Sequence, residues 1–284
     1  YKPGFRADTM VPKCMWVKKN EPENWAKTKT IMEFEDWLNW KLTGRKTVSM
    51  SVAAFRWNYD DKNGGYPVDF YNAVGLDDVI DKFPEPVLKV GEVVGNISAE
   101  AAEIFGLSKK TVVVEGTADC NACMFGVGGV RPNGMTLIGG TSTCLLGLSE
   151  EEFHVDGVNG TYPNCMYDGT SLLEGGQTAA GSILTWFKNN LLPAAWMQEA
   201  VNRNMNIYDL ITEKASAVPI GCDGLVMMDY FQGNRAPYAD SKARGMFWGL
   251  SIGTTPAHLA RAVYEGVAYG ANHCIVSMKK AGYD

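Results

Sequence analysis

The first third of the chain combines one clear helical pattern with polar breaks. Large apolar residues recur at helical spacing through residues 24–43, and Gly44 follows them, which predicts a helix that ends at a glycine. Residues 56–65 are polar and close with Asn-Gly-Gly, which predicts a loop. Ser98 stands before residues 99–105 as a helix cap would.

A different pattern begins near residue 111. The valines at 112–114 predict a strand, and a segment of small residues follows it. Residues 135–148 predict two strands joined by a Gly-Gly-Thr-Ser turn, and residues 178–187 predict a helix behind a further strand. This order of strand, hairpin, strand and helix is typical of the start of an actin-like (ribonuclease H-like) ATPase domain.

The C-terminal part is also strongly patterned. Residues 225–229 predict a buried strand, residues 231–240 a loop rich in Gly, Asn and Pro, and residues 256–278 a helix with one apolar face. We therefore expect a two-domain α/β fold of the actin-like class. Residues 1–109 would be the end of the first domain, and residues 110–284 the beginning of the second.

Composition narrows the class of protein. The chain of 284 residues is 46% hydrophobic, which is enough to bury one large core or two ordinary ones. Its net charge of -6 argues against the basic stripe of a nucleic-acid surface, so we expect no nucleic-acid partner. No apolar run approaches the ~20 residues that span a bilayer, and we expect no membrane partner.

Seven cysteines are scattered through the chain and predict reduced, mostly buried thiols in a cytoplasmic protein. Cys120 and Cys123 form a CxxC pair, which could serve zinc binding or redox chemistry. No second such pair follows at zinc-site spacing, and the histidines (His154, His258 and His273) are far apart in sequence. We therefore expect small core residues on one helical turn there, and no metal site.

One long motif resembles a known family. Residues 245–265 read GMFWGLSIGTTPAHLARAVYE and resemble the second signature of the FGGY carbohydrate kinases, with Gly245, Gly249, His258 and Glu265 among the matching positions. Many fixed residue types at fixed offsets rarely coincide by chance. The resemblance implies a two-domain kinase that transfers a phosphoryl group from ATP to a sugar hydroxyl.

Weaker matches extend the resemblance from about residue 12 to the C-terminus. Lys13, Trp16 and the Asn-Glu-Pro at 20–22 match part of the family's first signature, although Cys14 stands where a bulky apolar residue is usual. Residues 36–44 resemble its D-x-L … L-T-G segment.

The resemblance implies a catalytic base at Asp119, which lies in EGTADCNACMFGVGG and matches the family's aspartate. Transfer to a hydroxyl needs a carboxylate within hydrogen-bond reach to accept the proton. The alternative is that Asp119 only caps a helix that begins near Cys120.

Two glycine-rich segments resemble the family's nucleotide contacts. Gly140 and Thr141, in GGTST, match a phosphate loop in which the backbone approaches the phosphate and Thr141 adds a hydroxyl, so both are expected to bind ATP. A plain hairpin turn would read the same way. Gly181, in GGQTAAGSILTW, would leave room for the nucleotide, or else allow tight helix–sheet packing. ATP and Mg²⁺ are the implied cofactors, and we expect Asp119 and Thr141 to face one cleft.

Three segments resemble the ribulokinase-like branch of the family. Arg56 lies in FRWNYD, which resembles K-W-x-Y with Arg in place of Lys, and Glu174 lies in an E-x-G-Q segment. Residues 233–235 resemble a G-N-R loop. Arg56 and Glu174 are therefore expected to bind sugar hydroxyls. A surface or ion-pair role for Arg56 stays open, and the exchange of Lys for Arg leaves the exact sugar open.

The family's N-terminal D-x-G-T loop has no match in the sequence, and its C-terminal Gly-Gly segment would follow Asp284. We therefore expect a fold incomplete at both ends, with exposed apolar surface on residues 1–109. The expected function is ATP-dependent phosphorylation of a pentulose such as ribulose. The alternatives are a xylulose or polyol kinase and a non-catalytic actin-like module. The sequence leaves open whether the protein forms a homodimer.

Overall fold

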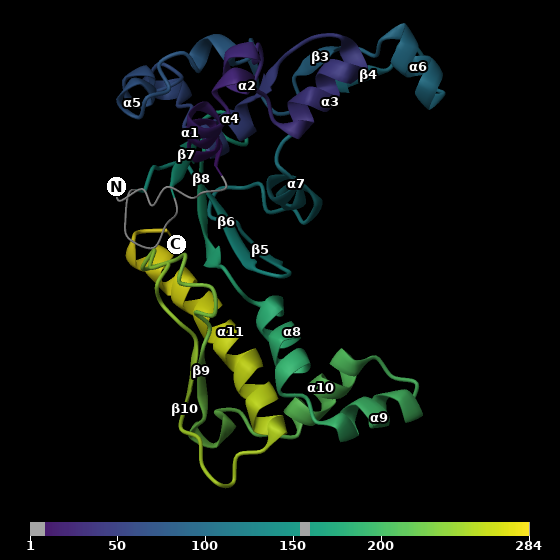
Figure 1. The fold of residues 1–284 in the computed structure, drawn as a ribbon, viewed down its shortest axis with the longest axis vertical. Coiled ribbons are helices and arrows are strands. Elements are labelled where there is room, and N and C mark those ends of the chain that lie inside the picture. The colour runs from purple at the N-terminus through teal and green to yellow at the C-terminus, as the bar shows by residue number, and fades with distance from the viewer. Residues whose placement is uncertain (1–8, 154–159, 284) are drawn as a thin grey trace.

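The computed structural model describes residues 9–153 and 160–283, in three regions that follow one another along its long axis (Figure 1). Short helices and strands of the first 114 residues lie at one end, and a four-stranded sheet lies in the middle. Helices and a two-stranded sheet from the C-terminal part form the other end.

The first region holds these elements in chain order: α1 (Met10–Asn20), α2 (Pro22–Lys27), α3 (Phe34–Thr43), β1 (Val48–Ser49), α4 (Met50–Trp57), η1 (Asp61–Asn63), α5 (Val68–Ala73), η2 (Ile80–Lys82), β2 (Val87–Leu88), β3 (Val93–Asn96), α6 (Ala99–Phe105) and β4 (Val112–Val114). The strands pair only in twos among the described residues, β1 with β2 in parallel and β3 with β4 antiparallel. Trp57, Tyr71 and Leu76 are fully buried at the centre of the core that joins α1, α4 and α5.

The single helix predicted for residues 24–43 is wrong, because the chain forms α2 and α3 with an irregular segment between them. In that segment the Ile31 N–H donates to the Lys82 carbonyl oxygen at 2.8 Å, so the backbone pairs with a distant part of the chain instead of continuing the helix. The stop at Gly44 is confirmed, with a left-handed φ of 79°.

The loop predicted for residues 56–65 begins too early. Arg56 lies in the last turn of α4, because residues 50–54 are buried and carry the helix onward to Trp57. Asn58 ends it in the left-handed conformation. The cap at Ser98 is confirmed, since its hydroxyl oxygen accepts a hydrogen bond from the Ala101 N–H.

The predicted apolar exposure on the first region is present in the structure. Phe34, Ile104 and Phe105 are 75%, 69% and 59% exposed. An apolar groove of about 590 Å³ runs between α3, α6 and β4 and is lined by Leu38, Leu42, Ile97, Phe105, Leu107, Thr111, Val112 and Val113.

The middle region is built on one antiparallel sheet. Helix α7 (Asp119–Gly126) precedes β5 (Met135–Gly139), β6 (Thr143–Ser149), β7 (Thr161–Pro163) and β8 (Ser171–Gln177), which are ordered β5-β6-β8-β7. The two predicted strands with a turn at residues 140–142 are therefore confirmed. At Gly176, φ is 136°, and a Cβ would stand 2.1 Å from the Thr143 carbonyl oxygen, so only glycine allows β6 and β8 to approach so closely.

The C-terminal region contains α8 (Gly181–Asn190), α9 (Ala194–Asn202), α10 (Ile207–Ser216), η3 (Cys222–Gly224), β9 (Val226–Met228), β10 (Met246–Trp248) and α11 (Pro256–Lys280). The helix predicted from residue 178 begins at Gly181, because Thr178 and Ala180 hydrogen-bond to the Gly233 and Thr141 carbonyl oxygens. The strand predicted as buried is buried on one face, with Met227 at 3%, while Val226 and Met228 on its other face are 48% and 39% exposed.

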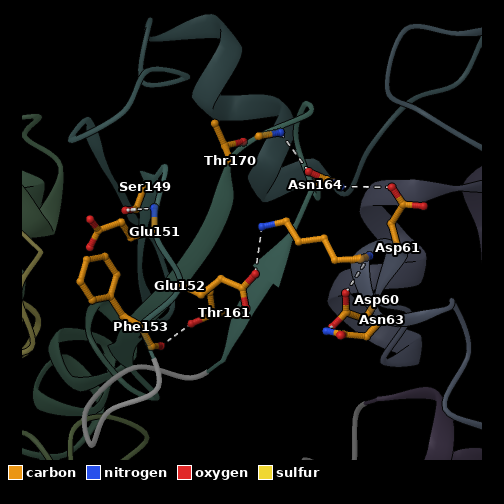
Figure 2. Close-up of polar contacts among 12 residues, drawn as sticks. Asp60, Asp61, Asn63, Ser149, Glu151, Glu152, Phe153, Thr161, Asn164 and Thr170 are labelled. Carbon is orange, nitrogen blue, oxygen red and sulfur yellow. Dashed lines mark hydrogen bonds and ion pairs between the residues drawn. The ribbon is translucent and has the colours of Figure 1, made fainter.

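Polar side chains join the first region to the middle sheet. Lys62 Nζ lies 2.9 Å from Glu152 Oε1, and Asn164 Nδ2 donates to Asp61 Oδ2 at 3.1 Å (Figure 2). Phe55 of α4 also packs edge-on against Tyr162 of β7, with ring centroids 5.0 Å apart. The two predicted domains therefore contact each other through α4 and the loops around β7, and their boundary near residue 109 stays a prediction.

Candidate functional site

Asp119 is the first residue of α7 and is exposed at the end of the β4–α7 connection. Its Oδ1 accepts a hydrogen bond from the Cys120 N–H at 2.7 Å. The alternative interpretation of Asp119 as a helix cap is wrong, because Ala118 is the N-cap of α7 and the bond of Asp119 to the next residue leaves its carboxylate at the surface. The exposed carboxylate of Asp119 can therefore receive a proton from a bound hydroxyl.

Glu174 approaches the same place from β8. The pKa of the neighbouring Cys120 thiol is raised to about 11, first by burial, then by the negative charge of Glu174, and then by that of Asp119. Both predicted carboxylates thus act on one thiol from opposite elements. Glu174 is only 2% exposed, and its Oε1 lies 3.5 Å from Arg235 Nη1.

The E-x-G-Q segment and the G-N-R loop meet in the structure. Besides the ion pair of Glu174 with Arg235, Gln177 Nε2 donates to Asp229 Oδ2 at 2.7 Å and to the Val267 carbonyl oxygen at 2.9 Å. Burial raises the pKa of Asp229 above its usual range. Sequence reasoning named the loop but missed Arg235 as the partner of Glu174, because a contact across 61 residues leaves no local signal.

Arg56 lies on α4, half-buried, with its guanidinium 5.8 Å from the Phe55 ring. Phe55 in turn packs on Tyr162 of β7, which pairs with Leu172 in the same sheet as Glu174. Arg56 therefore lies on the helix that joins the first region to this sheet.

A separate pocket of about 420 Å³ brings Thr141 and Gly181 together, with Ser182 and Thr185 as its other lining residues. Asp119 is not among the residues that line this pocket. The pocket is therefore not the single cleft that Asp119 and Thr141 were expected to share. Helix α7 nonetheless packs on β5 and β6, the strands that the turn at residues 140–142 connects.

The backbone around this pocket is largely engaged. The N–H groups of Ala180, Gly181 and Ser182 donate to the carbonyl oxygens of Gly140 and Thr141, at 2.9 to 3.2 Å. The Gly140 N–H donates to Ser142 at 2.9 Å. Within residues 9–153 and 160–283, the Thr141 N–H and hydroxyl make no hydrogen bond with the protein, so they are the donors that an anionic ligand could reach.

Three carboxyl groups that the sequence did not single out lie beneath the connection to Asp119. Asp36 and Glu115 are 0% and 1% exposed, and Glu115 accepts hydrogen bonds from Asn39 and Thr47. Burial, with the neighbouring carboxylates, raises the pKa of Glu35 to about 8 and that of Asp36 to about 7. The sequence signal was available in Asp36, which belongs to the D-x-L segment.

Most of the cysteines are buried, as expected. Cys14, Cys165, Cys222 and Cys274 are buried, whereas Cys123 is exposed, so the interpretation of the CxxC pair as two core residues is wrong for Cys123. In the described ranges, no three His, Cys, Asp or Glu side chains converge as a metal site would require. None of the helices in residues 9–153 and 160–283 is long and apolar enough to cross a membrane.

The sheet, α8 and α11 place the chain in the actin-like class of ATPase folds, as predicted. The N-terminal domain of the FGGY family of carbohydrate kinases matches residues 4–126, and the C-terminal domain matches residues 135–284. The chain belongs to the FGGY family of carbohydrate kinases.

Among relatives, it is 34% identical over 272 residues to "Ribulokinase 2" of Staphylococcus saprophyticus subsp. saprophyticus, covering 94% of this chain and 50% of that protein. A ribulokinase of Staphylococcus aureus is 34% identical over 267 residues, covering 93% and 49%. The chain thus spans about half the length of the curated relatives that it matches.

Solved structures agree on the fold. A xylulose kinase from Rhodospirillum rubrum superposes with a TM-score of 0.81 at 27% identity, over 98% of this chain and 54% of that one. A gluconate kinase from Lactobacillus acidophilus also reaches 0.81, at 21% identity over 96% and 53%.

Proposed function

We propose that the whole protein transfers a phosphoryl group from ATP to a hydroxyl of a pentulose, and that this pentulose is ribulose. The observation that carries this proposal is the position of Asp119 within a chain that belongs to the FGGY family. Its carboxylate is exposed at the start of α7, and Glu174 lies within electrostatic reach of the adjacent thiol. The ribulokinase names of the relatives support the choice of sugar.

In this mechanism Asp119 accepts the proton of the sugar hydroxyl as that oxygen attacks the γ-phosphorus of ATP. The bond from the γ-phosphorus to the bridging oxygen breaks, and ADP leaves. Glu174 and Arg56 hold other hydroxyls of the sugar. Thr141, with its N–H and hydroxyl, contacts the nucleotide phosphates at the pocket that Gly181 lines.

ATP suits this pocket because Thr141 offers two donors without protein partners in the described part of the chain. Bound ATP supplies the phosphoryl group. Mg²⁺ would enter with the nucleotide phosphates, since the described residues present no group of three or more His, Cys, Asp or Glu side chains that could hold it alone.

A panel of sugars tests the proposal. The whole protein, with ATP, would be assayed for ADP release with ribulose, xylulose, gluconate and glycerol. We expect the highest kcat/KM with ribulose. We also expect the enzyme to be cytoplasmic in its source cell. A clear preference for glycerol or gluconate would contradict the sugar assignment, and no turnover with any of the four would contradict the kinase assignment.

A further inference from the structure

A buried group of polar side chains lies directly behind Asp119. It consists of Ser51 on α4, Thr117, Asn121 on α7, and Cys165, and we refer to it as the Asn121 cluster. Ser51, Asn121 and Cys165 are each 0% exposed. A buried carboxamide surrounded by the apolar residues of the core is costly unless it is hydrogen-bonded.

The bonds of the cluster converge on one atom, the hydroxyl oxygen of Ser51. Asn121 Nδ2 donates to it at 3.1 Å, and Thr117 Oγ1 lies 2.5 Å from it. Cys165 Sγ completes the group, at 3.8 Å from Asn121 Nδ2 and 3.5 Å from Ser51 Oγ. A further serine, Ser49, donates its hydroxyl to the Gly116 carbonyl oxygen at 2.8 Å.

The contacts of the Asn121 cluster lie on both sides of Asp119 in the sequence. Thr117 lies two residues before Asp119, and Asn121 lies two residues after it. One hydroxyl from a distant helix therefore fixes both sides of the five-residue segment that carries the exposed carboxylate. An apolar residue at position 121 would fill the core equally well, so the polar bonds contribute a defined position instead of extra burial.

We propose that Ser51 and Asn121 are positioning residues for phosphoryl transfer, which act by holding Asp119 at the distance from the sugar hydroxyl that proton transfer requires. This inference rests on the function proposed above. Displacement of a catalytic group by about 1 Å can reduce the rate by about 10²-fold, so loss of these bonds should affect turnover more than binding.

The test compares Ser51→Ala with Ser171→Ala in the whole protein. Ser171 is also 0% exposed, but its hydroxyl has no hydrogen-bond partner among the described residues, so its removal deletes the same atoms without breaking a bond seen there. Ser51→Ala should lower kcat about 10- to 100-fold and change KM for the sugar less than 2-fold, while Ser171→Ala changes neither. Equal effects of the two variants would overturn the inference.

Combination with Asp119→Asn separates positioning from a general loss of structure. If Ser51 acts through Asp119, Ser51→Ala should cause no further loss of kcat once Asp119→Asn is present. An undiminished 10-fold loss in the double variant would overturn the inference. Should Ser51→Ala fail to fold, Thr117→Val removes one bond of the same cluster with little change in shape, and the same outcomes are expected from it.

Hydrogen exchange of the backbone amides at residues 122–126, of which the Ala122 N–H donates to the Ala118 carbonyl oxygen at 2.8 Å, gives a readout independent of the sugar. Exchange there should rise at least 10-fold in Ser51→Ala and stay unchanged in Ser171→Ala. If the parent protein shows no sugar-dependent turnover, the proposed function fails but a raised exchange still supports the cluster as the anchor of this segment. Unchanged exchange in Ser51→Ala overturns the inference whatever the activity.

Discussion

The carbonyl oxygen of Gly140 accepts a hydrogen bond from the Gly181 N–H at 2.9 Å, and a Cβ on Gly181 would stand 2.6 Å from that same oxygen. The turn between β5 and β6 thus rests directly on the first residue of α8. The close packing of this turn against α8 is therefore a sufficient reason for glycine at position 181. It also sets the shape of the pocket beside Thr141.

We therefore predict that Gly181→Ala lowers the free energy of unfolding by about 1–3 kcal/mol, because the turn must move away from α8. Gly140→Ala is the matched control, since a Cβ there meets no atom within 4 Å, and we expect a change within about 0.5 kcal/mol. Urea unfolding of both variants measures the difference. Equal destabilisation would show that the contact does not limit position 181.

Asp119→Asn should reduce the turnover of the whole protein by about 100-fold or more, because the amide cannot accept the proton of the hydroxyl. The amide oxygen can still accept the Cys120 N–H bond, so the start of α7 and the binding of sugar should be retained. Steady-state kinetics and sugar binding by calorimetry measure the two effects. Turnover within a few-fold of the parent would contradict the role of Asp119 as the base.

Periodicity and turn residues predicted the elements whose partners are close in sequence. The hairpin of residues 135–149, the cap at Ser98 and the long helix α11 fall in this group, because local spacing and local capping bonds determine them. The elements whose bounds were predicted wrongly depend on contacts with residues far away in the sequence. Helix α2 ends at Lys27, and Ile31 in the segment after it pairs with Lys82. Helix α8 begins late because Thr178 and Ala180 bond to other loops.

The candidate site divides in the same way. Asp119, Glu174 and Thr141 were found because motif residues mark them, and they remain predictions until their variants are assayed. Ser51 was not found and Arg235 was named only as part of the G-N-R loop, because their contacts with Asn121 and Glu174 span 70 and 61 residues of sequence. No periodic or compositional signal encodes such a contact.

The pairing of Arg235 with Glu174 predicts a coupling in stability. Arg235→Met removes a cation 3.5 Å from a carboxylate that is 2% exposed, so we expect a loss of about 2 kcal/mol or more in the free energy of unfolding. Glu174→Gln in the same background should recover most of that loss. A double-mutant cycle by urea unfolding measures the coupling, and purely additive effects would contradict it.

The carboxyl groups beneath the Asp119 segment predict that the protein loses stability as the pH rises. Burial, with the neighbouring carboxylates, raises the pKa of Glu35 to about 8 and that of Asp36 to about 7 in the folded state, whereas in the unfolded chain both titrate near ~4. Between these values the unfolded chain has lost protons that the folded chain keeps. The free energy of unfolding therefore falls from about pH 4 to about pH 8.

Glu35→Gln should remove part of this slope, because an amide does not ionise. We expect its Tm to exceed that of the parent by about 2–4 °C at pH 8.5, which corresponds to roughly 1 kcal/mol for a chain of this size. At pH 5 the advantage should be much smaller, since most of the pH interval in which only the unfolded chain has lost this proton lies above pH 5. Glu103→Gln, at an exposed position of α6, is the matched control and should follow the parent at every pH. Calorimetric scans across pH 5–8.5 measure both variants, and a Glu35→Gln curve parallel to that of the parent would show that this carboxyl titrates normally.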